Sequence, residues 1–285
     1  MKTTKLFFFT LLSIVFIFAA CSDGSNGGAS ALSIKMTDAP FPHDKVSAAT
    51  VTITKIDARL KSGENTAQGD AQFITLSEAE TTLNLLDLSN GITHTLANTE
   101  VPEGSYDLVR LFVSEASIVL TDGTTYNVQV PSGAQTGIKV FVKPSVIVAG
   151  GLTTDLLLDF DVSSSFILKG NMNMPGGITG FLFKPVIKAS NLSTSGTLTG
   201  MVTTSSTDVN PLTALEGVEV SVYAADTLNT KTFTDVEGKY TVLGLSAGFY
   251  KVEAELEGYA SKEEQDVNIV AGNKTTVNFE LLPSN

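Results

Sequence analysis

The segment Asp159–Phe160–Asp161 places two carboxylates two positions apart within an apolar stretch of the chain. Alternate side chains of a β-strand point to the same face, so these two carboxylates can share one site. Carboxylate oxygens are the ligands that Ca²⁺ prefers, and Asp38 offers a third donor from an earlier segment, TDAP (37–40). A calcium site is therefore one interpretation of these three residues.

A structural role is the favoured interpretation of the same carboxylates. Arg110 stands inside the apolar segment LVRLFV (108–113). A guanidinium in such surroundings needs a carboxylate partner, because an uncompensated buried charge is strongly destabilising. We therefore predict an ion pair between Arg110 and Asp159 or Asp161, or else turns that these aspartates cap. A hydrolase that uses the two carboxylates is the least favoured interpretation, because that chemistry requires a fixed separation in space that the sequence does not provide.

Other catalytic groups are scarce. Histidine, the commonest general base, occurs only as His43, in a proline-rich loop, and as His94, in GITHT (91–95). The sequence contains no HExxH zinc motif, no G-x-S-x-G nucleophile elbow and no Walker loop for phosphate. We expect a protein that is not an enzyme and that needs no cofactor, with calcium as the one alternative left open.

Three tyrosines give a weak indication of sugar binding. Non-catalytic sandwiches bind sugars by stacking aromatic rings on the sugar ring and by hydrogen bonds to its hydroxyls. Tyr126, Tyr223 and Tyr259 are the candidates, because they alternate outward or stand beside turns, although the chain contains no Trp. Packing at the rim of a sandwich is the favoured role for all three.

The single cysteine, Cys21, stands between an apolar segment and a polar, glycine-rich one. Lys2 and Lys5 precede an uncharged run, LFFFTLLSIVFIFAA (6–20), which is shorter than the about 20 residues of a transmembrane helix. This is the layout of a signal peptide over residues 1–20. The small residues directly before Cys21 resemble the bacterial lipobox, which implies acylation of the Cys21 thiol. The alternative is an ordinary secretory signal with an incidental cysteine.

The segment SDGSNGGAS (22–30) is too polar and glycine-rich to pack, so we expect residues 21–30 to be a flexible tether. By resemblance to lipoprotein sorting signals, Ser22 argues against retention in the inner membrane. The pair Ser22–Asp23 is similar to a shortened form of the acidic signal that exports lipoproteins to the cell surface. We expect an outer-membrane lipoprotein held by its acyl chains, facing either the periplasm or the exterior.

Composition narrows the fold class and the partners. The chain has 30 acidic and 18 basic side chains and a net charge of −12, which repels nucleic-acid phosphates. Short strand patterns recur from Leu32 onward, separated by turn clusters such as PEGS, TDG and PSG. These features predict an all-β protein with two antiparallel β-sandwich domains.

The boundary between the two domains is predicted from a change of composition. Near SNLSTSGTLTG (190–200) the chain becomes polar and glycine-bearing, and a new series of strands begins. We place the first domain at residues 31–192 and the second at 196–285. In YKVEAELEGY (250–259) apolar and charged residues alternate, which predicts a strand with one buried and one solvated face.

Motifs in both domains resemble known families. TDVEGKY (234–240) and GLSAGFYKV (244–252) resemble the carboxypeptidase regulatory-like family, and the similarity extends over residues 196–282. That family implies a non-catalytic, transthyretin-like sandwich of the carbohydrate-binding-like fold. The first domain resembles domain of unknown function 4382, found in bacterial envelope lipoproteins, through KMTDAPF (35–41), LNLLDLSNG (83–91), VPEGSYDLVRL (101–111), LLLDFDVSSSF (156–166) and FKPVIKA (183–189).

A pattern of the form hydrophobic-x-x-Gly-x-Tyr occurs in each domain, in VPEGSY (101–106) and LSAGFY (245–250). Glycine before a large aromatic residue is typical of the point where a turn enters a strand. We therefore expect both segments to begin strands of similar sandwiches.

Together these features predict a non-enzymatic, lipid-anchored envelope protein that binds or adheres. By fold resemblance alone, the expected ligand is a glycan or another surface macromolecule. The alternative is a structural or accessory subunit of an outer-membrane assembly, with an envelope protein as its partner.

Overall fold

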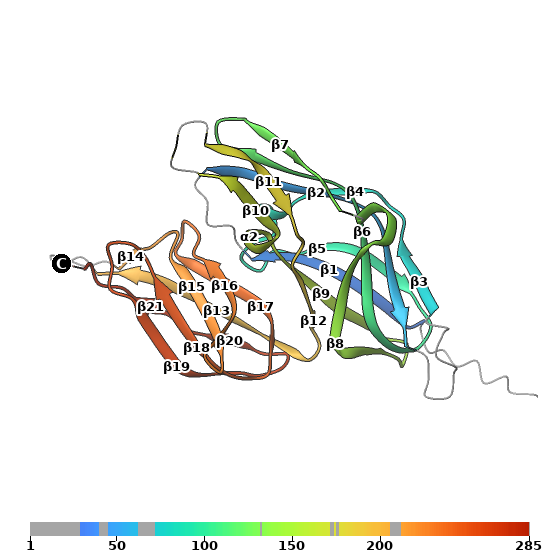
Figure 1. Ribbon diagram of the computed structural model, residues 1–285. Coiled ribbons are helices and arrows are strands. Elements are labelled where there is room, and N and C mark those ends of the chain that lie inside the picture. Colours follow the sequence, from blue (N-terminus) through green and yellow to red (C-terminus); the bar gives the residue numbers. More distant parts are fainter. Residues whose placement is uncertain are drawn as a thin grey trace, which may run out of the picture.

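A computed structural model describes residues 29–39, 45–61, 72–131, 133–171, 174, 177–205 and 212–284. These residues are almost entirely β-strands, which form two β-sandwich domains in succession along the chain (Figure 1). The predicted all-β fold is confirmed. The predicted signal peptide, Cys21 and His43 lie outside the described residues, as does all of the predicted tether before residue 29. Across the described ranges, no helix has the length and apolar character needed to cross a membrane.

The first domain contains two packed sheets and a two-stranded ribbon. Its strands are β1 (Ala31–Ala39), β2 (Val46–Leu60), β3 (Gln72–Ser77), β4 (Thr81–Asn84), β5 (His94–Glu100), β6 (Gly104–Leu120), β7 (Thr125–Val128), β8 (Ile138–Val148), β9 (Thr153–Asp161), β10 (Phe166–Gly170), β11 (Ile178–Phe183) and β12 (Ile187–Asn191). Three single turns of helix connect them: η1 (Leu85–Leu88), α1 (Gly133–Thr136) and α2 (Val162–Ser165).

One sheet of this domain has the order β12-β9-β1-β5, and its central pair, β1 and β9, is parallel. The other has the order β3-β2-β6-β7 and is built on two long strands, β2 and β6, whose edges also pair with β4 and β8. The strands β10 and β11 form the separate ribbon. Except for the parallel pair, the predicted antiparallel arrangement holds throughout these sheets.

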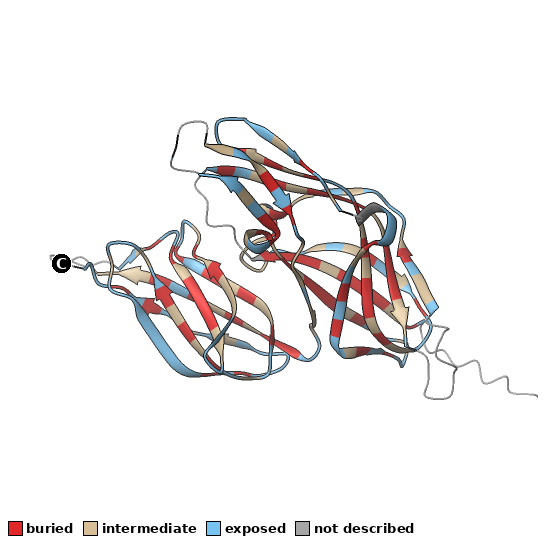
Figure 2. Ribbon diagram, viewed as in Figure 1, coloured by how far each residue is buried: buried red, intermediate tan, exposed pale blue. Residues whose placement is uncertain are grey.

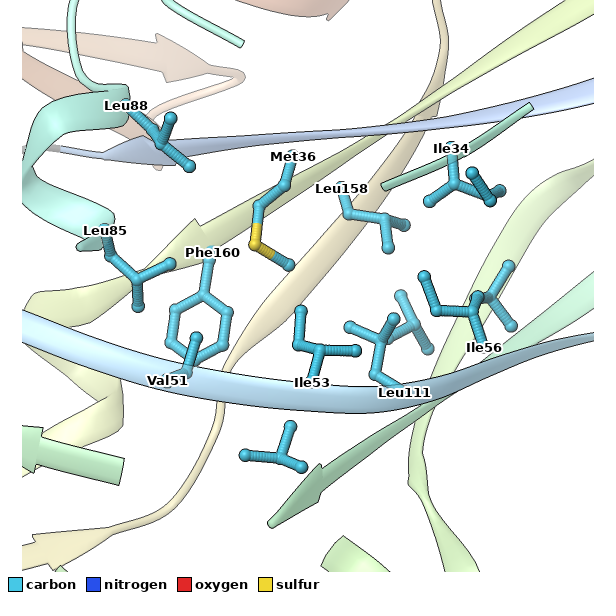
Figure 3. Packing of buried hydrophobic residues seen from close by; sticks show 14 of the residues in the cluster. Ile34, Met36, Val51, Ile53, Ile56, Leu85, Leu88, Leu111, Leu158 and Phe160 are labelled. Carbon is cyan, nitrogen blue, oxygen red and sulfur yellow. The ribbon is translucent and has the colours of Figure 1, made fainter. Parts of the chain in front are cut away.

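Alternation along the strands builds the core of the first domain. Figure 3 shows side chains from the two sheets meeting between them, with Met36 and Leu158 on one side and Ile53 and Leu111 on the other. All four are at most 2% exposed. Figure 2 shows the same alternation of buried and exposed residues along the strands of both domains. Burial of apolar surface, at about 25 cal/mol per Å², is the main stabilising contribution to such a core.

The second domain is a smaller sandwich. Its strands are β13 (Ser195–Thr204), β14 (Thr213–Ala214), β15 (Glu219–Ala224), β16 (Thr227–Phe233), β17 (Lys239–Ser246), β18 (Gly248–Glu255), β19 (Lys262–Ile269), β20 (Lys274–Thr276) and β21 (Phe279–Glu280). One sheet has β13 at its centre, paired with β14, β17, β20 and β21, and the other has the order β16-β15-β18-β19. The prediction of purely antiparallel sheets is wrong here too, because β20 and β21 pair with β13 in parallel. The predicted alternation in β18 is confirmed, because Tyr250, Val252 and Ala254 are all buried.

The repeated glycine–tyrosine pattern forms the same local structure in both domains. Gly104 and Gly248 begin β6 and β18 with φ values of 151° and 154°. Two residues later, the Tyr106 hydroxyl donates to the carbonyl of Pro102 at 2.8 Å, and the Tyr250 hydroxyl donates to the carbonyl of Ser246 at 2.9 Å. The predicted entry from turn to strand is confirmed in each case, and each buried tyrosine fastens the preceding turn to its strand.

A turn of the first domain contacts the second domain directly. Asn90 and Gly91, both with positive φ, lie between η1 and β5. The Asn90 side-chain oxygen accepts hydrogen bonds from the Thr232 hydroxyl and the Thr241 amide, both at 3.3 Å, and its amide nitrogen donates to the Lys239 carbonyl at 3.4 Å. A Cβ at Gly91 would lie 2.7 Å from the Thr241 side chain, so only glycine fits there. We call Asn90–Gly91 the interdomain turn.

Candidate functional site

The partner of Arg110 is Asp57, so the predicted pair with Asp159 or Asp161 is wrong. The Arg110 guanidinium donates to the Asp57 carboxylate at 2.6 Å, across a register that pairs β2 with β6. Asp57 is only 2% exposed and also lies 3.3 Å from the Lys55 ammonium and 3.1 Å from the Thr75 hydroxyl. Arg110 does have a carboxylate partner, as predicted, but that partner is Asp57.

Arg110 lies on the outer face of its sheet, which explains the error. Its guanidinium carbon lies 3.5 Å from the centre of the Phe73 ring and 5.5 Å from that of Phe112, and its side chain is 25% exposed. Asp159 and Asp161 belong to β9 of the other sheet. The sequence did contain a signal for the true partner, because Lys55, Asp57 and Arg59 alternate as charged residues along β2.

The three calcium candidates do not form one site. Leu158 and Phe160 of β9 point into the core, so Asp159 and Asp161 point away from it. Asp38 continues the buried alternation of β1 after Met36, and its carboxylate accepts from the Val162 amide at 3.2 Å.

Asp161 serves instead as the N-cap of the short helix α2. Its carboxylate accepts from the Ser164 amide and from the Ser163 and Ser164 hydroxyls, each at 2.8 Å. Capping of this kind satisfies amides that have no partner within the helix. In the part of the chain that the structure describes, no group of three or more His, Cys, Asp or Glu side chains is placed to hold a metal ion.

Asp159 faces the second domain and is electrostatically perturbed. It lines a narrow crevice of about 20 Å³ together with Asp38, with Gly91 of the interdomain turn and with residues of β16 and β17. Burial raises the pKa of Asp159 to about 6, the positive charge of Lys188 opposes that rise, and the Asp161 charge adds to it. Burial also raises the pKa of Asp38 well above its usual range, against the opposing effect of the Val162 amide.

Replacing Asp159 with asparagine should change how stability depends on pH. The folded-state pKa lies above the unfolded value, so the native protein binds a proton first as the pH falls from about 6 to about 4, and stability rises over that window. At pH 8 the ionised carboxylate carries its full burial penalty. The variant should then be more stable than the parent by about 1–2 kcal/mol, after allowance for partial exposure.

Urea unfolding of parent and variant at pH 8 and pH 5 measures this effect. The stability advantage of Asp159→Asn should shrink at the lower pH. An equal difference at both pH values would show that Asp159 does not titrate in this range.

The three candidate tyrosines do not share a surface. Tyr126 packs edge-on against Phe181, with ring centres 5.6 Å apart, and its hydroxyl donates to a backbone carbonyl. Tyr223, in the second domain, lies under the Lys251 ammonium, 4.3 Å from the ring centre. Tyr259 forms an isolated bridge with Pro283 and packs against the second core. Tyr126 packs against an aromatic ring and Tyr223 against a cation, each within its own domain. The three rings therefore do not form a common surface on which a sugar could stack.

A groove that the sequence analysis missed lies on the outer face of the sheet built on β2 and β6. Its volume is about 590 Å³. Its lining comes from β2, β4, β6, β7 and the two residues that follow β7: Thr50, Thr52, Thr82, Ser114, Glu115, Ala116, Ser117, Asn127, Val128, Gln129 and Val130. We call it the threonine groove. A β-bulge borders it, because Ser114 and Glu115 are both exposed where the register between β2 and β6 shifts.

Neutral hydroxyls dominate this groove. The Thr50 and Ser117 hydroxyls lie 2.6 Å apart, and those of Thr52 and Thr82 lie 2.9 Å apart, each pair bridging two strands. A hydroxyl has one donor and two acceptor positions, so each pair keeps capacity for a ligand. Glu115 is the one charged side chain among the lining residues. The alternation of threonines with Val51 and Ile53 along β2 is the sequence signal that could have located this surface.

Comparisons with known proteins find a family model for each of the two domains. The model of the carboxypeptidase regulatory-like domain matches residues 197–282, as the sequence motifs predicted. The model of a domain of unknown function, DUF4382, matches residues 29–185, more than half of the chain. No curated protein sequence matches the chain.

Solved structures with related folds are distant. A chain of a type II cohesin–X–dockerin complex from Acetivibrio cellulolyticus is 19% identical over 31% of this chain and 58% of its own length, with a TM-score of 0.25. The minor pilin GBS52 from Streptococcus agalactiae is 13% identical over 89% and 96%, with a TM-score of 0.26. The shaft pilin SpaA from Lactobacillus rhamnosus GG is 10% identical over 90% and 98%, with a TM-score of 0.27. Similarities this weak indicate no function, and the family models alone assign the chain: it belongs to the DUF4382 family and carries a carboxypeptidase regulatory-like domain after the DUF4382 domain.

Proposed function

We propose that this protein is a non-enzymatic binding module of the bacterial outer membrane, anchored by lipid at Cys21, and that it takes a neutral, hydroxyl-rich ligand such as a glycan in the threonine groove. The observation that carries the ligand class is the lining of that groove. Seven of its side chains are neutral hydroxyls or amides, namely Thr50, Thr52, Thr82, Ser114, Ser117, Asn127 and Gln129.

The chemistry of the lining supports a polyhydroxylated ligand. Sugar hydroxyls both donate and accept hydrogen bonds, as threonine, serine, asparagine and glutamine side chains do. The half-buried side chain of Val130 borders the same groove and can contact the C–H face of a sugar ring. The volume of about 590 Å³ falls within the range of about 300–1,000 Å³ typical of small-molecule pockets. An anionic ligand is disfavoured, because the lining holds a carboxylate, Glu115, and no cation.

The same lining supports a binding role without catalysis. Glu115 is the one titratable side chain in the groove. Acid–base hydrolysis of a glycoside uses a pair of carboxyl groups at a defined separation, and a single exposed carboxylate has no second group to work with. We therefore propose that the groove holds its ligand unchanged.

A glycan array followed by titration of the positive glycans tests this proposal. Thr82→Val and Asn127→Ala each remove groove hydrogen bonds and should weaken binding about 2–10-fold. Thr179→Val, which removes an exposed hydroxyl on the β10–β11 ribbon, is the matched control and should leave affinity unchanged.

Two outcomes would decide against the ligand. Loss of affinity in Thr179→Val as large as in Thr82→Val would place the ligand outside the groove. An array without positives, together with stable capture of an envelope protein by the isolated chain, would favour the alternative of a structural subunit.

A further inference from the structure

The surface formed by β8 and the turn between β8 and β9 exposes large apolar side chains beside lysines. Phe141, Ile147 and Leu152 are 56%, 70% and 69% exposed. Lys139 and Lys143 are also exposed and alternate with the apolar residues along β8. We call these five residues the β8–β9 surface. Three large apolar side chains exposed to this extent along one edge strand and the turn that follows it indicate an interaction site.

The alternation of β8 explains why these residues share a face. Val140, Val142, Val146 and Val148 are buried in the core, so the residues between them point outward. The Lys143 ammonium lies 5.8 Å from the centre of the Phe141 ring, so charge and apolar surface are in contact. Cations are outnumbered in this protein of net charge −12, which makes a lysine-bearing apolar face distinctive.

This surface adjoins the point where the described chain begins. The Ala31 amide donates to the carbonyl of Leu152 at 3.1 Å, and the Gly151 amide donates to the Ser30 hydroxyl at 2.9 Å. The Glu103 carboxylate fastens both segments, because it accepts from the Ser30 hydroxyl and from the Gly150 amide, each at 2.9 Å. Leu152 is thus held next to the entry of the tether.

The length of the tether limits how far this surface can lie from a lipid anchor. Residue 29 follows Cys21 by eight positions. Eight residues span at most about 29 Å when fully extended. An acylated Cys21 therefore lies within about 29 Å of residue 29, which is next to the segment that contacts Leu152.

We propose that the β8–β9 surface rests on the lipid headgroup layer of the membrane that anchors the protein. Ile147 and Leu152 enter the boundary between headgroups and acyl chains, and the ammonium groups of Lys139 and Lys143 lie among the lipid phosphates. Apolar side chains flanked by lysines are suited to this interface, because the lysine stems lie along apolar surface while their charges stay with the headgroups. The inference rests on the proposed anchor at Cys21.

A cysteine substitution tests the contact in the anchored protein. Cys21 is the single cysteine of the chain, so once it is acylated an introduced cysteine is the one free thiol. Leu152→Cys is labelled with an environment-sensitive fluorophore, and the lipidated protein is reconstituted into vesicles of phosphatidylethanolamine and phosphatidylglycerol. Nitroxide groups on the lipids should quench this label strongly. Leu182→Cys, an exposed position on β11, is the matched control and should stay unquenched.

A second measurement does not depend on the anchor. The chain from residue 21 onward, with Cys21→Ala, should partition onto phosphatidylglycerol vesicles, and removal of Lys139 or Lys143 by alanine should lower the partition coefficient about fivefold for each lysine. Vesicles of phosphatidylcholine should show a much smaller effect of the same substitutions.

The outcomes separate this inference from the proposed anchor. Equal quenching at positions 152 and 182 in a protein that floats with the vesicles would overturn the membrane contact and leave the anchor in place. Failure of the parent to take up labelled palmitate would overturn the anchor, while the partition of the Cys21→Ala chain would still decide the surface. The inference would be refuted if positions 152 and 182 were quenched equally and the lysine substitutions also left the partition coefficient unchanged. A protein partner would then be the occupant of this surface.

Discussion

Replacing Cys21 with alanine should move the protein from the membrane pellet to the soluble fraction. Each lipid CH₂ buried in the bilayer contributes about 0.8 kcal/mol, so the acyl chains on this thiol supply far more binding free energy than the β8–β9 surface can. The change should therefore be almost complete, even though the surface contact remains. Fractionation of cells after labelling with radioactive palmitate measures both location and acylation.

A conservative control accompanies this variant. Ser22→Ala leaves the thiol in place and should keep the protein in the pellet with its label. Palmitate that still enters the Cys21→Ala chain would refute acylation at this residue. A Cys21→Ala chain that stays in the pellet without label would show that another contact holds the protein to the membrane.

Removing Arg110 should produce the second large effect, on stability. Arg110→Ala leaves the Asp57 carboxylate, 2% exposed, with only Lys55 as a counter-charge, and it also removes the cation from the Phe73 ring. Breaking a fully buried pair costs about 3–5 kcal/mol. Because Arg110 is partly exposed and Lys55 remains, we expect a loss of about 2–3 kcal/mol and a melting temperature lower by about 5–10 °C.

The neighbouring pair Arg59–Asp107 is the matched control. Its guanidinium contacts the carboxylate at 2.8 Å and 3.0 Å, but the two side chains are 28% and 26% exposed. A solvent-exposed pair contributes less than about 1 kcal/mol, so Arg59→Ala should lower the melting temperature much less. Calorimetry measures the melting temperatures of Arg110→Ala and Arg59→Ala. An equal decrease in the two variants would mean that burial of Asp57 does not strengthen its ion pair.

The strands were predictable from the sequence because they depend on neighbours in the chain. Alternation in YKVEAELEGY gave a strand with its buried and exposed faces correctly assigned, and the glycine–tyrosine pattern located the starts of β6 and β18. Both signals are local, since they depend on side chains one or two positions apart.

The partner of Arg110 could not be predicted in the same way. Asp57 and Arg110 are 53 positions apart and meet only because β2 and β6 pair in one particular register. A shift of that register by one residue would turn every side chain of the strand to the opposite face. The sequence named Asp159 and Asp161 because their own surroundings are apolar, yet they lie on a different sheet and face the second domain.

The threonine groove was missed for a related reason. A row of threonines in a strand is usual on any solvated face, and nothing in β2 alone distinguishes a groove from a flat surface. The hollow arises where β2, β4 and the β6–β7 hairpin come together beside a bulge. That arrangement combines three separate parts of the chain.

The interdomain turn limits how the second domain can move relative to the first. Asn90 makes three hydrogen bonds to the second domain, and only residues 192–194 separate β12 from β13. A joint this short and this well fastened gives the second sandwich little freedom to swivel. Any contact that orients the first sandwich therefore also sets the position and orientation of the second sandwich.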